Sequence, residues 1–163
     1  DRKGNGLILS KSIKMNTTLA NMSGISNGKV IDTDKEYAVA EEYRKKLKTK
    51  CPTVEQNVGN LSGGNQQKVL LAKWMFADPD ILILDEPTRG IDVGAKYEIY
   101  CIINDLVAAG KSVIMISSEL PEVLGMSDRI YIMNEGRFVG EVSGEEATSE
   151  LIMSRIVKSG KGE

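Results

Sequence analysis

The stretch that decides the fold is residues 60–92, which read NLSGGNQQKVLLAKWMFADPDILILDEPTRGID. Ser62 stands where the N-cap of a helix belongs, and the residues after it keep helical spacing as far as Ala77. The apolar run 81–84 does not alternate, which predicts a strand buried on both faces. This run ends at Asp85 and Glu86. A glycine turn, a helix, a buried strand and two carboxylates, in this order, suit a site that holds a phosphate and activates a water.

The residues that follow predict a second strand beside the first. Residues 92–109 have the pattern of a long helix, which Gly110 closes just past its end. Residues 112–117 contain another unbroken apolar run, predicted as a second strand buried on both faces. A strand, a helix and a strand in this order imply a parallel pair with a right-handed crossover. We therefore expect an α/β fold with parallel strands.

Helices and a hairpin are expected on either side of this core. Residues 12–22 and 32–50 are predicted as helices, the second capped by Asp32 or Asp34. The later residues predict three further elements: a short helix over 121–125, a β-hairpin of 129–133 and 137–141 with Gly136 in its turn, and a last helix over 143–158.

Composition excludes several classes of function. The chain of 163 residues has a net charge of −2 at pH 7, so it lacks the basic surface typical of nucleic-acid binding. It has no histidine, and its two cysteines, Cys51 and Cys101, lack metal-binding spacing, which favours two reduced thiols. No apolar run reaches the roughly 18 residues that a membrane span needs.

Two short motifs carry the chemistry. At Ser62-Gly63-Gly64 the glycines let a phosphate approach the backbone, and the helix behind them offers unpaired N–H groups. Asp85, at the carboxyl end of a strand, is placed to hold Mg²⁺ through water, and Glu86 to polarise an attacking water. Each motif also has a plain structural explanation: a capped helix after a glycine turn, and a strand end followed by a turn.

Taken together, the motifs resemble those of the ATP-binding-cassette ATPases. Residues 61–67 are similar to the signature motif, 81–86 to the Walker B strand with its catalytic glutamate, and 89–92 to the D-loop. The segments 65–68, 85–96 and 116–123 further resemble the C-terminal cassette of bacterial ribose, galactose and xylose importers, in which one polypeptide carries two cassettes. The similarity extends to Asp1-Arg2-Lys3, at the Q-loop position.

The resemblance implies a partial P-loop NTPase core with parallel strands, a C-terminal β-hairpin and an α-helical subdomain. Residues 1–58 would form the helical subdomain with the Q-loop remnant, and residues 59–163 the C-terminal part of the ATPase core. The implied activity is ATP hydrolysis that powers monosaccharide import, with ATP and Mg²⁺ as cofactors. The implied roles are catalytic for Glu86 and Ser118, Mg²⁺-binding for Asp85, and nucleotide-binding for Ser62, Gly63, Gly64, Asn65, Gln66 and Asp92.

The implied partners are a second cassette, membrane permease subunits and, indirectly, a periplasmic sugar-binding protein, with no nucleic acid. The implied location is the cytoplasmic face of the bacterial inner membrane. In this family the signature motif faces a nucleotide held by the other cassette. Ser62 would therefore serve one nucleotide, and Asp85 and Glu86 another.

The sequence departs from the family pattern at two places. No Gly-x-x-x-x-Gly-Lys-Ser/Thr segment occurs, so the resemblance implies a fragment without the P-loop. We expect such a fragment to have no significant ATP affinity and an open strand edge prone to self-association. Ser118 also stands where the family's switch histidine usually lies. Two alternatives therefore stay open: a regulatory cassette with weak hydrolysis, and a non-transport ATPase of the same superfamily.

Overall fold

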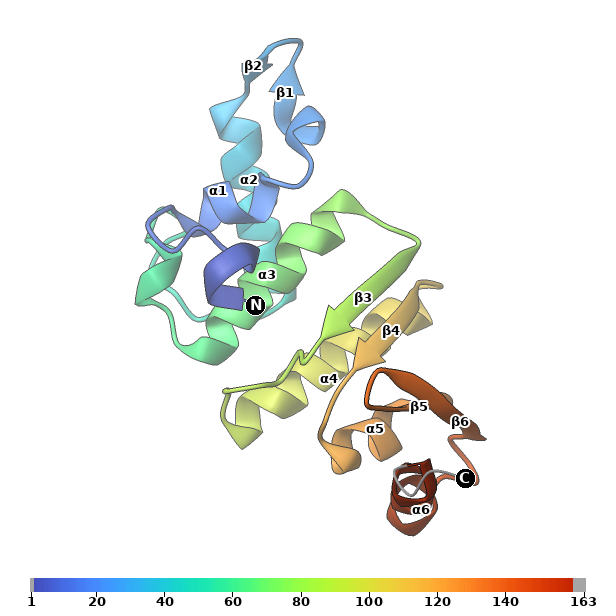
Figure 1. The fold of residues 1–163 in the computed structure, drawn as a ribbon. Helices are drawn as coiled ribbons and strands as arrows, with labels where there is room; N and C mark the ends of the chain where they lie inside the picture. Colours follow the sequence, from blue (N-terminus) through green and yellow to red (C-terminus); the bar gives the residue numbers. More distant parts are fainter. Residues whose placement is uncertain (1, 160–163) are drawn as a thin grey trace. The chain divides into compact units, whose positions relative to one another are not determined.

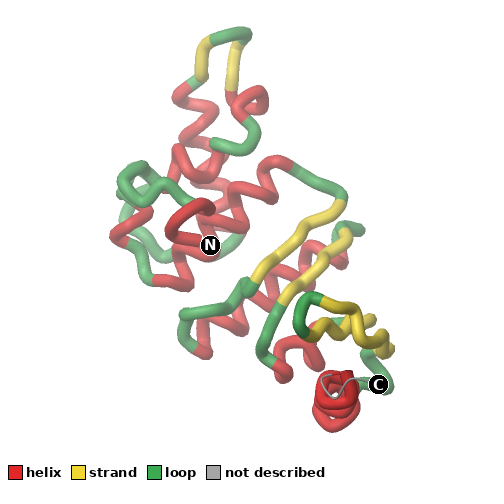
Figure 2. The backbone as a smooth tube through the Cα atoms, in the orientation of Figure 1, coloured by secondary structure: helices red, strands yellow, loops and turns green. Residues whose placement is uncertain are grey.

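The computed structural model of the chain describes residues 2–159, with side chains from residue 4 onward. The chain forms two compact units, Asp1–Ile114 and Met115–Glu163. The predicted Q-loop remnant at residues 1–3 lies outside the described side chains. Figures 1 and 2 show the fold as a ribbon and as a tube coloured by secondary structure.

The first unit holds most of the helices. In chain order its elements are the π-helix Arg2–Gly6, α1 (Ile13–Thr18), a 3-10 turn (Met22–Ile25), β1 (Ser26–Asn27), β2 (Val30–Ile31), α2 (Thr33–Lys46), a 3-10 turn (Val58–Asn60), α3 (Gly63–Ala77), β3 (Ile81–Asp85) and α4 (Val93–Ala108). Strand β4 (Ser112–Ile116) spans the boundary between the units. The second unit holds α5 (Leu120–Met126), β5 (Arg129–Asn134), β6 (Arg137–Ser143) and α6 (Ser149–Ser159).

Local capping explains where the helices begin. Ser62 Oγ accepts from the Asn65 amide at the start of α3, as predicted. Asp32 caps α2 by accepting from two backbone amides, and Asp92 caps α4. The helix predicted over 12–22 ends earlier, at Thr18, because the Asn21 side chain accepts from the Gly24 amide and nucleates a separate 3-10 turn. The helix predicted to reach residue 50 ends at Lys46.

A hydrophobic cluster joins the helical part of the first unit. Helices α1, α2 and α3 each contribute to it, and so do the segment before α1 and the connector between α2 and α3 (Figure 1). Its buried members are Leu7, Ile13, Ala40, Val54, Val58 and Val69. Residues 6–10, which precede α1, form the end of the π-helix and a turn.

Strands β3 and β4 form a two-stranded sheet and run in the same direction, which confirms the parallel pair (Figure 1). The predicted burial on both faces is wrong. Leu82 and Leu84 are buried, but Ile81 and Ile83 are 59% and 63% exposed. Strand β4 shows the same alternation, with Ile114 exposed. An unbroken apolar run predicts double burial only where both faces of the sheet are covered, and the described chain covers one.

The second unit is built on the predicted β-hairpin. Strands β5 and β6 pair antiparallel from Arg129 opposite Ser143 to Asn134 opposite Arg137. Glu135 and Gly136 both have positive φ in the turn. The inner face packs on α6 through Ile130, Ile132, Val142 and Ile152. The last helix begins at Ser149 rather than at the predicted residue 143, because β6 continues through Ser143.

Candidate functional site

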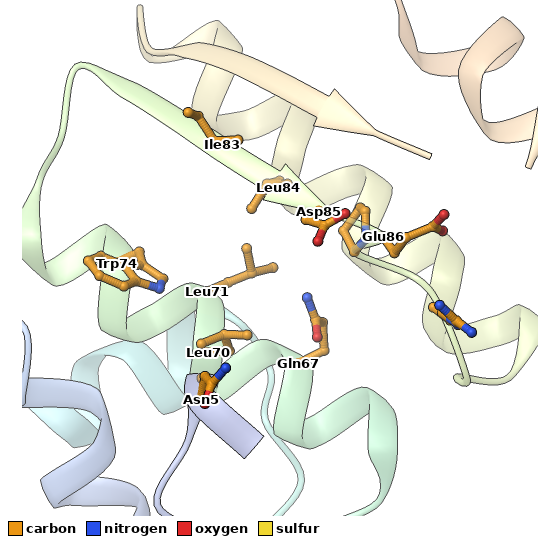
Figure 3. Close-up of a pocket in the computed structure, with 12 residues that line it drawn as sticks. Asn5, Gln67, Leu70, Leu71, Trp74, Ile83, Leu84, Asp85 and Glu86 are labelled. Carbon is orange, nitrogen blue, oxygen red and sulfur yellow. The ribbon is translucent and has the colours of Figure 1, made fainter. Parts of the chain in front are cut away.

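Two cavities of the first unit contain most of the predicted site residues. The larger has a volume of about 850 Å³ and lies beside the carboxyl end of β3 (Figure 3). Asp85 and Glu86 line it from the strand side, and residues of α3 line it from the other. The full lining is Asn5, Gly6, Gln67, Leu70, Leu71, Trp74, Ile83, Leu84, Asp85, Glu86, Pro87 and Arg89.

The backbone at the end of β3 changes direction sharply. Asp85 closes the strand, and Glu86 follows with φ of +48°, a left-handed conformation that is costly for a residue with a side chain. Pro87 and Thr88 are buried behind it and hold the turn in place. Glu86 is half-buried, whereas Asp85 is exposed to the cavity. The turn thus presents two adjacent carboxylates at the wall of one cavity.

The donor set of this cavity fits the ion that the sequence implies. Asp85 supplies hard oxygen donors on the side that faces α3, and Gln67 adds an amide from α3, while the Glu86 side chain extends away from them (Figure 3). Mg²⁺ in phosphate sites is usually held by one or two carboxylates and keeps several waters. An exposed Asp85 in a roomy, partly polar cavity leaves space for such waters.

The smaller cavity, of about 310 Å³, lies at the start of α3 and α4. It brings together four of the predicted nucleotide-binding residues, from two separate motifs. Its lining is Lys50, Ser62, Gly64, Asn65, Asp92, Gly94, Ala95 and Glu98. The sequence alone did not indicate that Asp92 and Ser62 share a cavity.

Hydrogen bonds fix the turn at the start of α3. The Asn65 Nδ2 donates to Ser62 Oγ at 2.9 Å, and the Lys50 backbone amide donates to Asn65 Oδ1 at 2.9 Å. The Asn65 amide also donates to Ser62 Oγ. In these bonds the Ser62 hydroxyl oxygen accepts, which leaves its proton for an acceptor in the cavity. That geometry suits a phosphate oxygen.

Gly64 has a packing role that the motif alone did not reveal. A Cβ added to it would lie 2.6 Å from the Ala95 Cβ of α4, closer than real Cβ atoms approach. Helices α3 and α4 can therefore meet here only because residue 64 lacks a side chain. Gly63, the other predicted glycine, is half-buried at the first position of α3.

Gln66, predicted to bind nucleotide, points away from both cavities. It is 4% exposed, and its Nε2 donates to the carbonyls of Val58 and Leu61. Its Oε1 is buried without a hydrogen-bond partner among protein atoms. Through these bonds the side chain holds residues 58–61, which precede the turn at the start of α3.

Ser118 lies in the second unit, in the segment between β4 and α5, and is exposed. Its neighbour Ser117 is held on both sides. Ser117 Oγ donates to the buried carboxylate of Glu122 and accepts from the Glu119 amide at 3.0 Å. The backbone around Ser118 is therefore fixed by residues of its own unit.

Several cavity residues were missed at the sequence level. Gln67, Leu71 and Trp74 recur at the i, i+4, i+7 spacing of one face of α3, and this spacing is the signal that could have placed them beside Asp85. Lys50 and Glu98 have no such signal, because they come from elements far apart in the sequence.

Comparison with known families identifies this architecture. The family model described as "ABC transporter" matches residues 4–89, just over half of the chain. The chain belongs to the ABC transporter family.

Close relatives within the ABC transporter family are named for sugars. The chain is 62% identical over 159 residues to the L-arabinose transport ATP-binding protein AraG of Geobacillus stearothermophilus. It is 57% identical to the xylose import ATP-binding protein XylG of Geobacillus kaustophilus and 54% identical to the ribose import ATP-binding protein RbsA of Clostridium tetani. The matches cover 94–98% of this chain but 31% of each relative.

Solved structures of ABC transporter cassettes share the fold. The ADP conformation of MJ1267, an ATP-binding cassette of an ABC transporter, has a TM-score of 0.71 at 22% identity, over 94% of this chain and 64% of that chain. A dimeric post-hydrolysis state of the cassette MJ0796, bound to ADP and Pi, has a TM-score of 0.70 at 22% identity, over 84% and 58%. These likenesses confirm the expected α/β architecture.

Proposed function

We propose that this chain is part of the C-terminal cassette of a bacterial monosaccharide importer, and that the intact two-cassette protein binds and hydrolyses ATP to drive import. The observation that carries the proposal is the division of the motif residues between two cavities. Asp85 and Glu86 line one, while Ser62, Asn65 and Asp92 line the other. The 54–62% identity to relatives named for arabinose, xylose and ribose supports the substrate class.

Each residue then has a defined task. Glu86 accepts a hydrogen bond from the attacking water and polarises it, and Asp85 holds Mg²⁺ through water. Bound Mg²⁺ would supply charge neutralisation at the phosphates. Ser118 donates a hydrogen bond to the terminal phosphate of the same nucleotide. The signature residues Ser62, Gly63, Gly64 and Asn65, with Asp92, face a nucleotide held by the other cassette, and Gln66 supports them from within the core.

The proposal extends to architecture and partners. Residues 1–58 would act as the helical subdomain that meets the permease, and residues 59–163 as the C-terminal part of the ATPase core. The second cassette lies in the same polypeptide or in a dimer partner, and a periplasmic sugar-binding protein acts indirectly. Such a protein works at the cytoplasmic face of the inner membrane. Among the helices of residues 2–159, none combines the length and apolar character that a membrane span needs.

The deciding experiment is Glu86→Gln in the full-length transport protein. Loss of the carboxylate is expected to lower kcat for ATP by about 100-fold, since positioned bases contribute on that order, and to leave ATP binding within about threefold. Glu145→Gln, on an exposed loop residue, is the matched control and is expected to turn over as wild type. Unchanged kcat in Glu86→Gln would show that the role is assigned wrongly.

A second candidate function is a cassette that clamps nucleotide and regulates but hydrolyses weakly. Ser118 favours it, because a hydroxyl cannot carry the charge or reach of an imidazole. The adjacent Asp85 and Glu86 carboxylates favour hydrolysis. Ser118→His in the full-length protein separates the two. A rise in hydrolysis at this site indicates that Ser118 limits the wild type, and no change removes the main support for a regulatory cassette.

A further inference from the structure

Lys68 is the largest fully buried side chain of the described residues. Its side chain is 2% exposed, and a charged ammonium is rarely buried this far unless it is paired. The ammonium makes two bonds, one to Glu98 Oε2 at 2.9 Å and one to the carbonyl of Lys48 at 3.0 Å. It therefore joins three segments: α3, α4 and the connector that follows α2.

We propose that Lys68 is a positioning residue for the smaller cavity: its ammonium neutralises Glu98 from behind the cavity wall and fastens the segment 48–50 to α3. The part of this inference that concerns ATP rests on the proposed function. The part that concerns the segment 48–50 does not.

Helices α3 and α4 meet through two successive contacts. Gly64 packs on Ala95, and one turn further along both helices Lys68 bonds to Glu98. The spacing is four residues on α3 and three on α4, so both contacts lie on one face of each helix. The small-residue contact sets the distance between the helices, and the ion pair fixes their rotation and register.

The smaller cavity has more acidic than basic residues in its lining. Its lining includes two acidic residues, Asp92 and Glu98, and one basic residue, Lys50. A phosphate group brought to Ser62 would meet an excess of negative charge unless Glu98 were compensated. Lys68 supplies that compensation: its hydrogen bond lowers the pKa of Glu98 against the opposing effect of burial, and the charges of Lys68 and then Lys50 lower it further.

The segment 48–50, which follows α2 in the chain, is bonded to α3 at both ends. Lys48 has φ of +51°, a left-handed conformation, and its carbonyl accepts from Lys68. Two residues later, the Lys50 backbone amide donates to Asn65 Oδ1 in the turn at the start of α3. The segment 48–50 is therefore bonded at one end to Lys68 and at the other to Asn65, and loss of the Lys68 ammonium would loosen both.

The first test measures hydrogen exchange in the full-length protein without nucleotide. Lys68→Met keeps the size of the side chain and removes the charge, so exchange in the peptide covering residues 48–50 is expected to rise about tenfold. Lys73→Met is the control, because Lys73 lies on the same helix and bonds to a different carbonyl, that of Gly6. Wild-type exchange in a folded Lys68→Met protein would overturn the fastening role.

Glu98→Lys is a second variant that does not depend on Lys68→Met folding. Glu98 is 47% exposed, so a lysine in its place is accommodated at the surface. The new ammonium would lie beside that of Lys68, and the two like charges would repel each other. Exchange in the same peptide is expected to rise severalfold. Wild-type exchange would contradict the proposal.

The second test measures ATP turnover and uses a rescue. Lys68→Met leaves the Glu98 charge uncompensated, so KM for ATP is expected to rise about tenfold. Adding Glu98→Gln removes that charge and is expected to return KM to within about threefold of wild type, although exchange at 48–50 stays high. A merely structural lysine would not be rescued in this way, so absence of rescue overturns the charge role. Absence of turnover in the wild type would instead refute the proposed function.

Discussion

At the scale of single residues, backbone strain marks where function is concentrated. Four non-glycine residues of the described chain have positive φ: Lys48, Asp78, Glu86 and Glu135. Lys48 and Asp78 follow helix ends, and Glu135 lies in a hairpin turn, where left-handed residues are common. Glu86 instead directly follows a strand and lines a cavity. A conformation that costs on the order of 1 kcal/mol is kept at the residue proposed to activate water.

Lys48 allows a direct measurement of such strain. Lys48→Gly is expected to raise the free energy of unfolding by about 0.5–1 kcal/mol, because glycine adopts positive φ without a steric cost and the carbonyl that accepts from Lys68 is kept. Lys45→Gly, inside α2, is the matched control and is expected to lower it by about 1 kcal/mol. Urea denaturation of the chain measures both. Equal destabilisation by the two would show that residue 48 is not strained in solution.

At the scale of elements, the sequence predicted what local chemistry determines. The bounds of α3 and α4 follow from Ser62, Asp92 and Gly110, residues that act on the backbone next to them. The hairpin turn follows from Gly136 for the same reason. The burial of β3 could not be predicted, because it depends on what covers each face of the sheet. The position of Lys50 beside the turn at the start of α3 likewise depends on tertiary contacts, which leave no local signal in the sequence.

The two faces of β3 are expected to respond differently to substitution. Leu82→Ala is expected to cost about 2–5 kcal/mol of unfolding free energy, as for other buried leucines. Ile83→Thr, on the exposed face, is expected to cost less than about 0.5 kcal/mol. Denaturant unfolding of the chain at low concentration compares them. If Ile83→Thr proved as costly as Leu82→Ala, the exposed face would be covered in solution, for example by a second copy across the open strand edge.

Helices α1 and α2 share an ion network that depends on pH. Lys14 on α1 lies 2.9 Å from Glu55 and 3.5 Å from Glu36 of α2, and the hydrogen bond to Glu55 raises the pKa of Lys14 above 10.5 against the opposing effect of burial. A raised folded-state pKa means that this stabilisation is fully present below about pH 10.5 and is lost as pH rises through the higher folded value.

Lys14→Met is therefore expected to remove part of the decrease in unfolding free energy that the wild type shows at alkaline pH. The difference in unfolding free energy between wild type and variant is expected to stay constant from pH 7 to about 10 and to shrink above that range. Urea titrations at several pH values measure it. A difference that did not change with pH would mean that the lysine contributes through its apolar stem rather than its charge.

At the scale of the whole chain, α3 connects the two cavities. Its first turn lines the smaller cavity, and Gln67 and Trp74 line the larger. Each cavity has only part of what a nucleotide needs. The lining of the larger cavity includes two acidic residues, Asp85 and Glu86, and one basic residue, Arg89. Its net negative charge therefore repels a triphosphate. The cavities thus have the character of half-sites, each completed by groups that it does not itself contain.

Trp74 provides the measurement, because it is the one tryptophan of the sequence and lies 43% exposed at the larger cavity. With this chain alone, Mg-ATP up to about 100 μM is expected to leave the fluorescence of Trp74 unchanged, which corresponds to binding weaker than about −5.5 kcal/mol. Quenching of free tryptophan by the same titration corrects for absorption by the nucleotide. A saturable change in the micromolar range would show instead that the half-site holds a nucleotide without its missing groups, and the division of function between two cavities would have to be abandoned.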